Sequence, residues 1–251
     1  MNDSLPSARL ILHESVTRPF LALQLHQSAS INSMGAAQLT SVLVLCALCV
    51  IGSVSATLGV DISQPLDGST ATCLKNAGYD KMIARGYKSS GSVDGAMCGS
   101  MKAAQNAGMQ VGVYLFPCPT CGDPSGQVQS VANALRDCGI YDSTIWLDIE
   151  GQQYWLGNSN SNRSFYTGLV DACNSSGYSC GVYSSYYQWQ NVMGTTDYSY
   201  GSDLPLWYAH YDDSPDMGDF QAFGGWYSAS MKQYQGDQTV CNFGVDLDYF
   251  E

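Results

Sequence analysis

Two carboxylates one residue apart, Asp148 and Glu150, follow directly on the apolar run Ile145-Trp146-Leu147. A short apolar run with β-branched and aromatic residues predicts a buried strand. Alternate residues of a strand point to the same face, so the two carboxyl groups are expected to project side by side. A buried carboxylate is costly unless it is hydrogen-bonded or catalytic, which makes this pair the first candidate for chemistry.

Further carboxylates stand at comparable places along the chain. Asp61 lies near the end of a predicted strand, residues 58–62, and Asp246 lies in another, residues 245–250, with Asp248 two positions later. A single aspartate at a strand end usually caps the next helix, but four carboxylates on one rim predict an active site. Their mutual repulsion should keep at least one protonated near neutral pH, as a general acid requires.

The elements that must position these residues alternate between strand and helix, which indicates a parallel sheet. About eight strands without a glycine-rich dinucleotide motif favour a closed barrel over an open sheet. The late connections are too short for full helices. The prediction is therefore a single α/β domain, an irregular TIM-like barrel with fewer than eight helices. The predicted helices are one that Ser69 or Thr70 caps and that runs to Ala77, followed by residues 94–107, 125–137, 161–175 and 185–192.

The N-terminal part of the chain predicts secretion. An uncharged apolar segment at about residues 39–51 leads into small residues that end at Ala56, so residues 34–56 are predicted to be a signal peptide. The segment is too short to favour a membrane-spanning helix. Residues 1–33 receive no assignment, and either Met1 or Met34 could be the start. Residues 57–251 form the predicted domain, expected outside the cell, in a gut lumen or in a phagolysosome.

Cysteine content and charge agree with that location. An even number of cysteines behind a signal peptide predicts a disulfide-stabilised domain, although spacing alone does not give the pairing. Two glycosylation sequons, at Asn162 and Asn174, point the same way. The net charge of −12 predicts that nucleic acid and anionic membranes are not partners. The eight cysteines are Cys73, Cys98, Cys118, Cys121, Cys138, Cys173, Cys180 and Cys241.

Other chemistries have little support in this sequence. After the predicted leader His210 is the one histidine, so it is expected to be a structural or substrate-contacting rim residue rather than part of a zinc site. Cys118 and Cys121 have redox-motif spacing, but structural disulfides explain them better. A carboxylate cluster could bind calcium or magnesium, yet no loop has regular ligand spacing. No metal and no cofactor are predicted.

Aromatic residues supply the second signal. Tyr114, Tyr183 and Tyr211 lie at predicted strand ends, where flat rings with a polar handle suit sugars. Trp207 lies in an apolar strand and is counted both as core and as a sugar contact. With Asp248 these four are the predicted substrate-binding residues. Carboxylates and aromatics without a cofactor motif point to glycoside hydrolysis.

Five blocks of sequence resemble the signature segments of glycoside hydrolase family 25, the Chalaropsis-type lysozymes. The segments IARGY (83–87) and YLFPCPTCG (114–122) are more similar to its secreted nematode and protist branch, and the resemblance runs from about Gly59 to the C-terminus. The blocks are GVDIS (59–63), WLDIEG (146–151), GVYSS (181–185), LWYAHY (206–211) and VDLDYF (245–250).

The resemblance implies an irregular α/β barrel that cleaves the β-1,4 bond between N-acetylmuramic acid and N-acetylglucosamine in peptidoglycan. It assigns Glu150 as general acid and Asp148 as its partner, which would orient the substrate's own acetamido nucleophile. Asp61 and Asp246 match the other two acids of the cleft. Bacterial members usually have asparagine where this chain has Asp248, which puts the pH optimum in question.

The expected partner is bacterial peptidoglycan, bound by a monomer for defence or digestion. Because the wall is itself anionic, the acidic surface should displace activity toward acidic pH. A chitinase-like hydrolase is the alternative enzyme, but its longer motif needs an aspartate where Trp146 stands. A non-catalytic, glycan-binding barrel is the alternative outside enzymes, and the presence of all four carboxylates argues against it.

Overall fold

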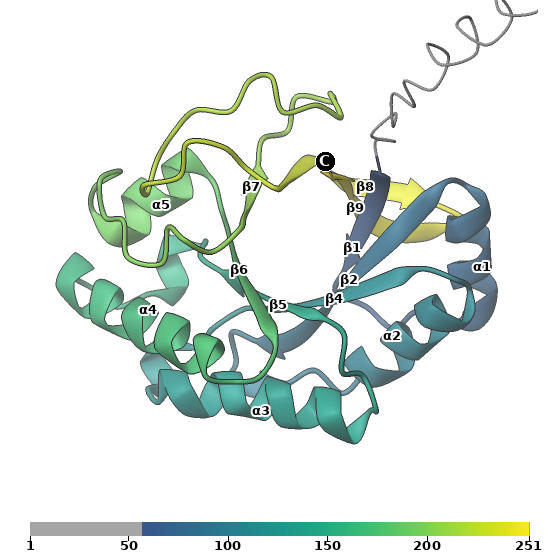
Figure 1. Ribbon diagram of the computed structural model, residues 1–251, viewed down its shortest axis with the longest axis horizontal. Coiled ribbons are helices and arrows are strands. Elements are labelled where there is room, and N and C mark those ends of the chain that lie inside the picture. The colour runs from purple at the N-terminus through teal and green to yellow at the C-terminus, as the bar shows by residue number, and fades with distance from the viewer. Residues whose placement is uncertain (1–56, 251) are drawn as a thin grey trace, which may run out of the picture. The chain divides into compact units, whose positions relative to one another are not determined.

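The computed structural model describes residues 57–250, and the predicted extension and signal peptide lie outside the described residues. The described residues form a closed barrel of eight strands with five α-helices, which confirms the predicted fold class. Figure 1 shows the strands as a ring with the helices on its outer side. No helix among residues 57–250 combines the length and the apolar character that a bilayer crossing needs.

The chain alternates strand and helix until β7, as the sequence predicts. The elements in order are β1 (Thr57–Ile62), α1 (Gly68–Asn76), β2 (Tyr79–Lys88), β3 (Ser92–Val93), α2 (Met97–Asn106), β4 (Gln110–Leu115), η1 (Pro119–Cys121), α3 (Pro124–Asp137), β5 (Thr144–Asp148), η2 (Gln152–Tyr154), α4 (Ser159–Asn174), β6 (Ser179–Ser184), α5 (Tyr186–Met193), β7 (Leu206–Ala209), β8 (Met231–Val240) and β9 (Phe243–Phe250).

The barrel closes between β1 and β2, and the strand order is β1-β9-β8-β7-β6-β5-β4-β2 with the short β3 outside it. All neighbours from β1 through β2 and β4 to β8 are parallel. The sequence pattern predicted a parallel sheet, but β9 runs antiparallel to both β8 and β1. Two residues, Cys241 and Asn242, join β8 to β9, and both have positive φ (56° and 58°). So short a connection allows only a hairpin, because a parallel pair needs a crossover of a dozen residues or more.

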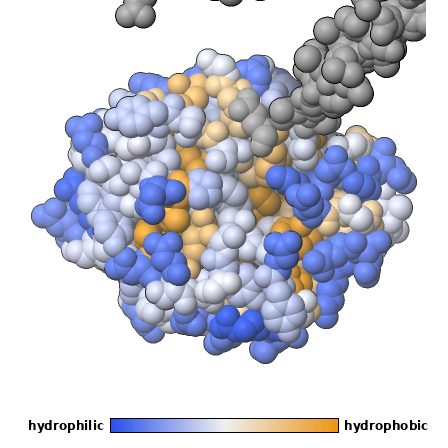
Figure 2. All heavy atoms as spheres, in the orientation of Figure 1, coloured by the Kyte–Doolittle hydropathy of each residue, from blue (hydrophilic) through white to orange (hydrophobic). Residues whose placement is uncertain are grey.

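Each barrel strand separates two apolar layers. In β5, Ile145 and Leu147 face the helices and belong to the large core between sheet and helices. Trp146 faces the opposite way, into a smaller cluster with Trp207 and Phe250 inside the barrel. A Cβ on Gly181 would lie 2.3 Å from the Trp146 ring, so glycine is needed there for the ring to fit. In the view of Figure 2, hydrophilic side chains cover most of the edge and apolar surface is exposed nearer the centre.

Local signals fix the helix starts. Asp67 caps α1 by accepting a hydrogen bond from the Thr70 backbone N–H (2.7 Å), so the predicted cap at Ser69 or Thr70 is wrong. Both of those residues already lie inside the helix. Ser185, predicted as the first residue of a helix, instead caps α5, with its hydroxyl accepting from the backbone N–H of Gln188. A side chain that satisfies an orphan N–H of the first turn favours helix at that point.

All eight predicted cysteines form disulfides, as the even count predicts. Cys73–Cys241 joins α1 to the β8–β9 turn across 168 positions, so it ties the first and last parts of the barrel together. The other pairs are Cys98–Cys138, Cys118–Cys121 and Cys173–Cys180.

One of the two sequons does not fit glycosylation. Asn162 is 3% exposed, and its amide accepts from Leu156 N–H and donates to the carbonyl of Val192. A glycan on that nitrogen is incompatible with this packing. Asn174, at the end of α4, is exposed.

Candidate active site

The four predicted catalytic carboxylates, Asp61, Asp148, Glu150 and Asp246, line one pocket of about 200 Å³ at the barrel mouth. Asp61 and Asp148 are 6% and 4% exposed, whereas Glu150 is half-buried just beyond β5. Asp148 and Glu150, which stand two positions apart, therefore bring both of their carboxyl groups to one site, as predicted.

Asp246 reaches this pocket by a different route from the one that the sequence predicts. It lies near the start of β9, not at the C-terminal end of a parallel strand. Because β9 is antiparallel, its early residues meet the C-terminal ends of the other strands, and Asp246 stands opposite Asp61 in the register. The same reversal carries Asp248 deeper into the barrel and Phe250 to the N-terminal ends of the other strands, where it pairs with Thr57 and Met231.

The burial of this cluster works against negative charge. Burial raises the pKa of Asp61 and Asp148 well above the ordinary range. The charges of Asp246 and Glu150 raise the pKa of Asp61 further, and those of Glu150 and Asp61 raise the pKa of Asp148. Burial and then the Asp246 charge raise the pKa of Glu150. Burial also raises the pKa of Asp246, which a 2.6 Å hydrogen bond from the Asp237 backbone N–H opposes. Carboxyl groups that cannot all ionise together share protons, so the cluster can offer a general acid beside a charged group.

The predicted aromatic contacts occupy different depths. Tyr114 is half-buried on the pocket wall, and Tyr211 is 60% exposed at its edge. Tyr183 and Trp207 also line the pocket but are only 5% and 2% exposed, with their rings in edge contact at 4.5 Å between centroids. These two therefore form the floor of the pocket, where a ring edge or hydroxyl rather than an open face meets a ligand.

Asp248 does not reach the pocket surface. Its side chain is fully buried, and its Oδ1 accepts a 2.9 Å hydrogen bond from Trp207 Nε1. No residue among those described donates to its Oδ2. The prediction of Asp248 as a substrate contact is therefore wrong for this structure, because Trp207 lies between it and the pocket. Burial, followed by the charge of Asp61, raises its pKa well above the ordinary range.

Sequence reasoning missed three polar residues of the pocket, Ser63, Arg85 and Gln233. Arg85 pairs with Asp94 (Nε to Oδ2, 2.8 Å) and donates to the backbone carbonyl of Ser63. Gln233, 3% exposed on β8, bonds to the side chains of Asp61 and two tyrosines. Alternation could have found the last two, since Arg85 stands two positions after the inward-facing Ile83, and Gln233 two after Met231.

A second cavity of about 330 Å³ adjoins the carboxylate pocket and shares Glu150, Tyr183 and Tyr211 with it. Its other walls come from the β6–α5 junction and from the segment between β7 and β8, and include Tyr187 and His210. None of Asp61, Asp148 and Asp246 lines it. Glu150 therefore stands at the boundary between the two cavities.

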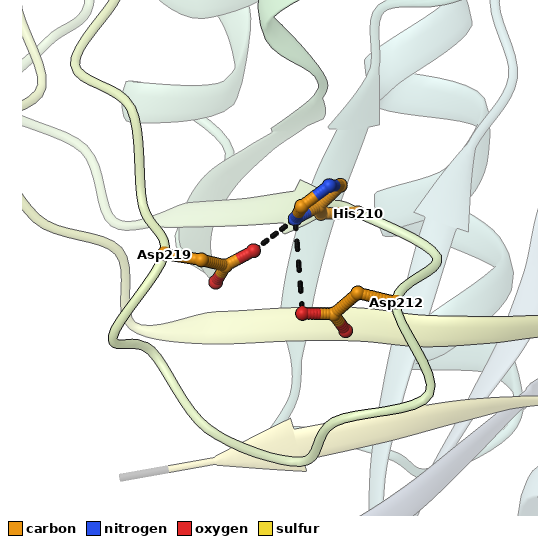
Figure 3. A group of neighbouring side chains, drawn as sticks. All are labelled: His210, Asp212 and Asp219. Carbon is orange, nitrogen blue, oxygen red and sulfur yellow. Dashed lines mark hydrogen bonds and ion pairs between the residues drawn. The ribbon is translucent and has the colours of Figure 1, made fainter.

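His210 is a rim residue of this second cavity, in line with the sequence-based expectation. Its Nδ1 contacts Asp219 and lies 3.9 Å from Asp212 Oδ2 (Figure 3). These three side chains are close enough to share a metal ion. Both carboxylates, however, already accept hydrogen bonds from the fully buried ammonium of Lys232, at 2.8 and 3.0 Å. The buried cation neutralises both carboxylates. The group therefore holds the segment between β7 and β8 against the barrel.

Known proteins resemble this chain over its described part. A sequence model of the family described as "Lysozyme-like protein 1" matches residues 52–234. "Probable GH family 25 lysozyme 2" of Dictyostelium discoideum is 44% identical over 198 residues, which cover 78% of this chain and 92% of that protein. "Lysozyme-like protein 5" of Caenorhabditis elegans is 40% identical over 195 residues, covering 76% and 90%.

Solved structures show the same fold at lower sequence identity. A family GH25 lysozyme from Aspergillus fumigatus superposes with a TM-score of 0.64 at 20% identity, covering 78% of this chain and 94% of the other. A muramidase from Trichobolus zukalii gives 0.62 at 23% identity, covering 78% and 93%. At these identities the similarity establishes the barrel architecture.

Proposed function

We propose that this chain, which belongs to the lysozymes of glycoside hydrolase family 25, cleaves the β-1,4 bond between N-acetylmuramic acid and N-acetylglucosamine. The chain is a glycoside hydrolase by that membership, and its relatives' names point to bacterial peptidoglycan as the substrate. The bond and the roles of single residues are the proposed part.

Glu150 is the proposed proton donor. Its raised pKa favours the protonated form that a general acid needs, and burial is the first cause of that shift. An acid that protonates the glycosidic oxygen must stand between the sugar that is attacked and the sugar that leaves. Glu150 has that position, at the boundary of the two cavities. The carboxylate pocket would hold the attacked sugar, and the cavity beside Tyr187 the leaving group.

One unsatisfied atom carries the assignment of Asp148. Its Oδ1 is buried and accepts no hydrogen bond from any described residue, although burial without a partner is costly. An N-acetyl sugar in the pocket would supply the missing donor, its amide N–H. The carboxylate would then orient the acetamido oxygen toward the anomeric carbon and stabilise the positive charge that develops there. A sugar with a free 2-hydroxyl could also donate to Oδ1, but it has no acetamido oxygen for the carboxylate to orient, so this role requires an N-acetylated substrate.

The decisive experiment is Glu150→Gln, measured by the loss of turbidity of a bacterial wall suspension. The substitution keeps the shape of the side chain but removes the acidic proton, and loss of general acid catalysis is expected to cost about 10²–10⁴-fold in rate. Asp142→Asn, at an exposed position, removes a carboxylate outside the pocket and serves as the matched control. Lysis by Glu150→Gln at the wild-type rate would refute the assignment.

Substrate class is tested by assaying chitin oligosaccharides beside peptidoglycan, with reducing ends counted in both. Release from chitin alone would favour the chitinase-like alternative, and binding without release a non-catalytic barrel. Secretion, a monomeric state, and action in defence or digestion are further parts of this proposal. Secretion rests on the predicted signal peptide and on the disulfides, which favour an oxidising compartment.

A further inference from the structure

Gln233 joins three side chains of the pocket through one amide. Its Oε1 accepts hydrogen bonds from the hydroxyls of Tyr183 (2.7 Å) and Tyr211 (2.8 Å). Its Nε2 donates to Asp61 Oδ2 at 2.6 Å. The amide is 3% exposed, and it comes from β8, whereas its partners come from β1, β6 and the segment after β7. It therefore links strands that are far apart in the sequence at the point where the carboxylates meet.

The two ends of the amide are not interchangeable here. An amide oxygen accepts and an amide nitrogen donates. With the nitrogen toward Asp61, every one of these bonds pairs a donor with an acceptor, and the bond to Asp61 is strongest when Asp61 carries negative charge. The reversed amide would place an oxygen against the carboxylate of Asp61, which requires a protonated Asp61. The orientation of Gln233 and the ionised form of Asp61 therefore stabilise each other.

This bond acts against the other influences on Asp61. Burial and the charges of Asp246 and Glu150 raise the pKa of Asp61, whereas the hydrogen bond from Gln233 lowers it. In a cluster of coupled carboxyl groups, a donor on one member moves the proton to the others. Negative charge on Asp61 in turn makes ionisation of Glu150 less favourable. The titratable and charged groups around Gln233 are Asp61, Arg85, Tyr114, Asp148, Glu150, Tyr183, Tyr211, Asp246 and the strand neighbour Asp248.

We propose that Gln233 is a positioning residue that directs the proton of the carboxylate cluster, holding negative charge on Asp61 so that Glu150 remains the acid. Through its oxygen it also fixes Tyr183 and Tyr211 on the pocket wall. The proposal rests on the role proposed above for Glu150. The pattern of carboxylates in the sequence does not itself indicate an amide on β8.

The test is the pH dependence of kcat/KM for Gln233→Met, which keeps the length of the side chain but removes the donor. Loss of a hydrogen bond to a charged group should move the acidic limb upward by about one to two pH units. The alkaline limb should move down, because a neutral Asp61 lets Glu150 ionise more easily. The profile thus narrows from both sides. Gln233→Glu is the second variant, since it keeps an acceptor for the tyrosines and also lacks the N–H, so its acidic limb should move up too.

Tyr183→Phe and Tyr211→Phe are the matched controls. Each removes one hydroxyl from Gln233 but leaves the donor on Asp61, so kcat/KM is expected to fall while both limbs stay in place. A uniform loss of activity in Gln233→Met with unmoved limbs would overturn the proposal, as would failure of both Gln233 variants to fold. Failure of the proposed function is recognised separately, by wild-type lysis that Glu150→Gln does not reduce.

Discussion

Replacement of Asp248 by asparagine should stabilise the protein, and by more as the pH rises. Asp248 lies fully buried in the barrel, where one oxygen accepts from Trp207 and no described residue donates to the other. Its raised pKa, which burial causes first, means that the folded protein binds a proton there that the unfolded chain releases. Asparagine keeps an acceptor for Trp207 and removes the need for that proton.

The size of the effect follows from proton linkage. For a group with a raised folded pKa, its contribution to stability is fully present below the unfolded pKa and is lost as pH rises through the folded pKa. Between these two pKa values, the uptake of one proton on folding lowers the free energy of unfolding by about 1.4 kcal/mol for each pH unit that the pH rises. The unfolding free energy of Asp248→Asn relative to the wild type should therefore rise with pH, by up to about 1.4 kcal/mol for each pH unit between the unfolded and the folded pKa of Asp248.

Urea unfolding of both proteins at several pH values, with the disulfides intact, measures this difference. Asp142→Asn is the control, because it makes the same chemical substitution at an exposed position and so reports the effect of net charge alone. A difference between wild type and Asp248→Asn that stays constant with pH would refute the reasoning, since it would mean that Asp248 binds no extra proton in the folded state.

Two further predictions follow from the site and the disulfides. Because burial and Asp246 raise the pKa of Glu150, this proposed acid loses its proton only as pH rises through that raised value, so the alkaline limb of wall lysis at constant ionic strength should lie above the range of an ordinary glutamate; an alkaline limb within that range would contradict this. Alanine at both Cys73 and Cys241 should cost about 5 kcal/mol in unfolding free energy, against about 4 kcal/mol for Cys98 with Cys138, because their separations are 168 and 40 residues. Equal unfolding midpoints in denaturant for the two double variants would argue against the chain-entropy origin of that difference.

The sequence alone determined the features that depend on neighbouring residues. The alternation in Ile145-Trp146-Leu147-Asp148 predicts which side chains face the helices and which face the barrel interior, because the period of a strand is fixed by its backbone. The even cysteine count predicts disulfides, and the alternation of strands with helices predicts a barrel. The sequence predicts the first residue of a helix less accurately: Asp67 caps α1, where Ser69 or Thr70 is predicted.

Pairing between distant segments was decided only by the tertiary structure. The two-residue turn after β8 reverses β9, and this reversal places Asp246 at the pocket while it buries Asp248 beneath Trp207. The Cys73–Cys241 disulfide and the contact of the Gln233 amide with Asp61 likewise depend on segments more than a hundred residues apart. The physical reason is that a carboxylate's protonation and exposure are set by the groups packed around it, and barrel closure chooses those groups.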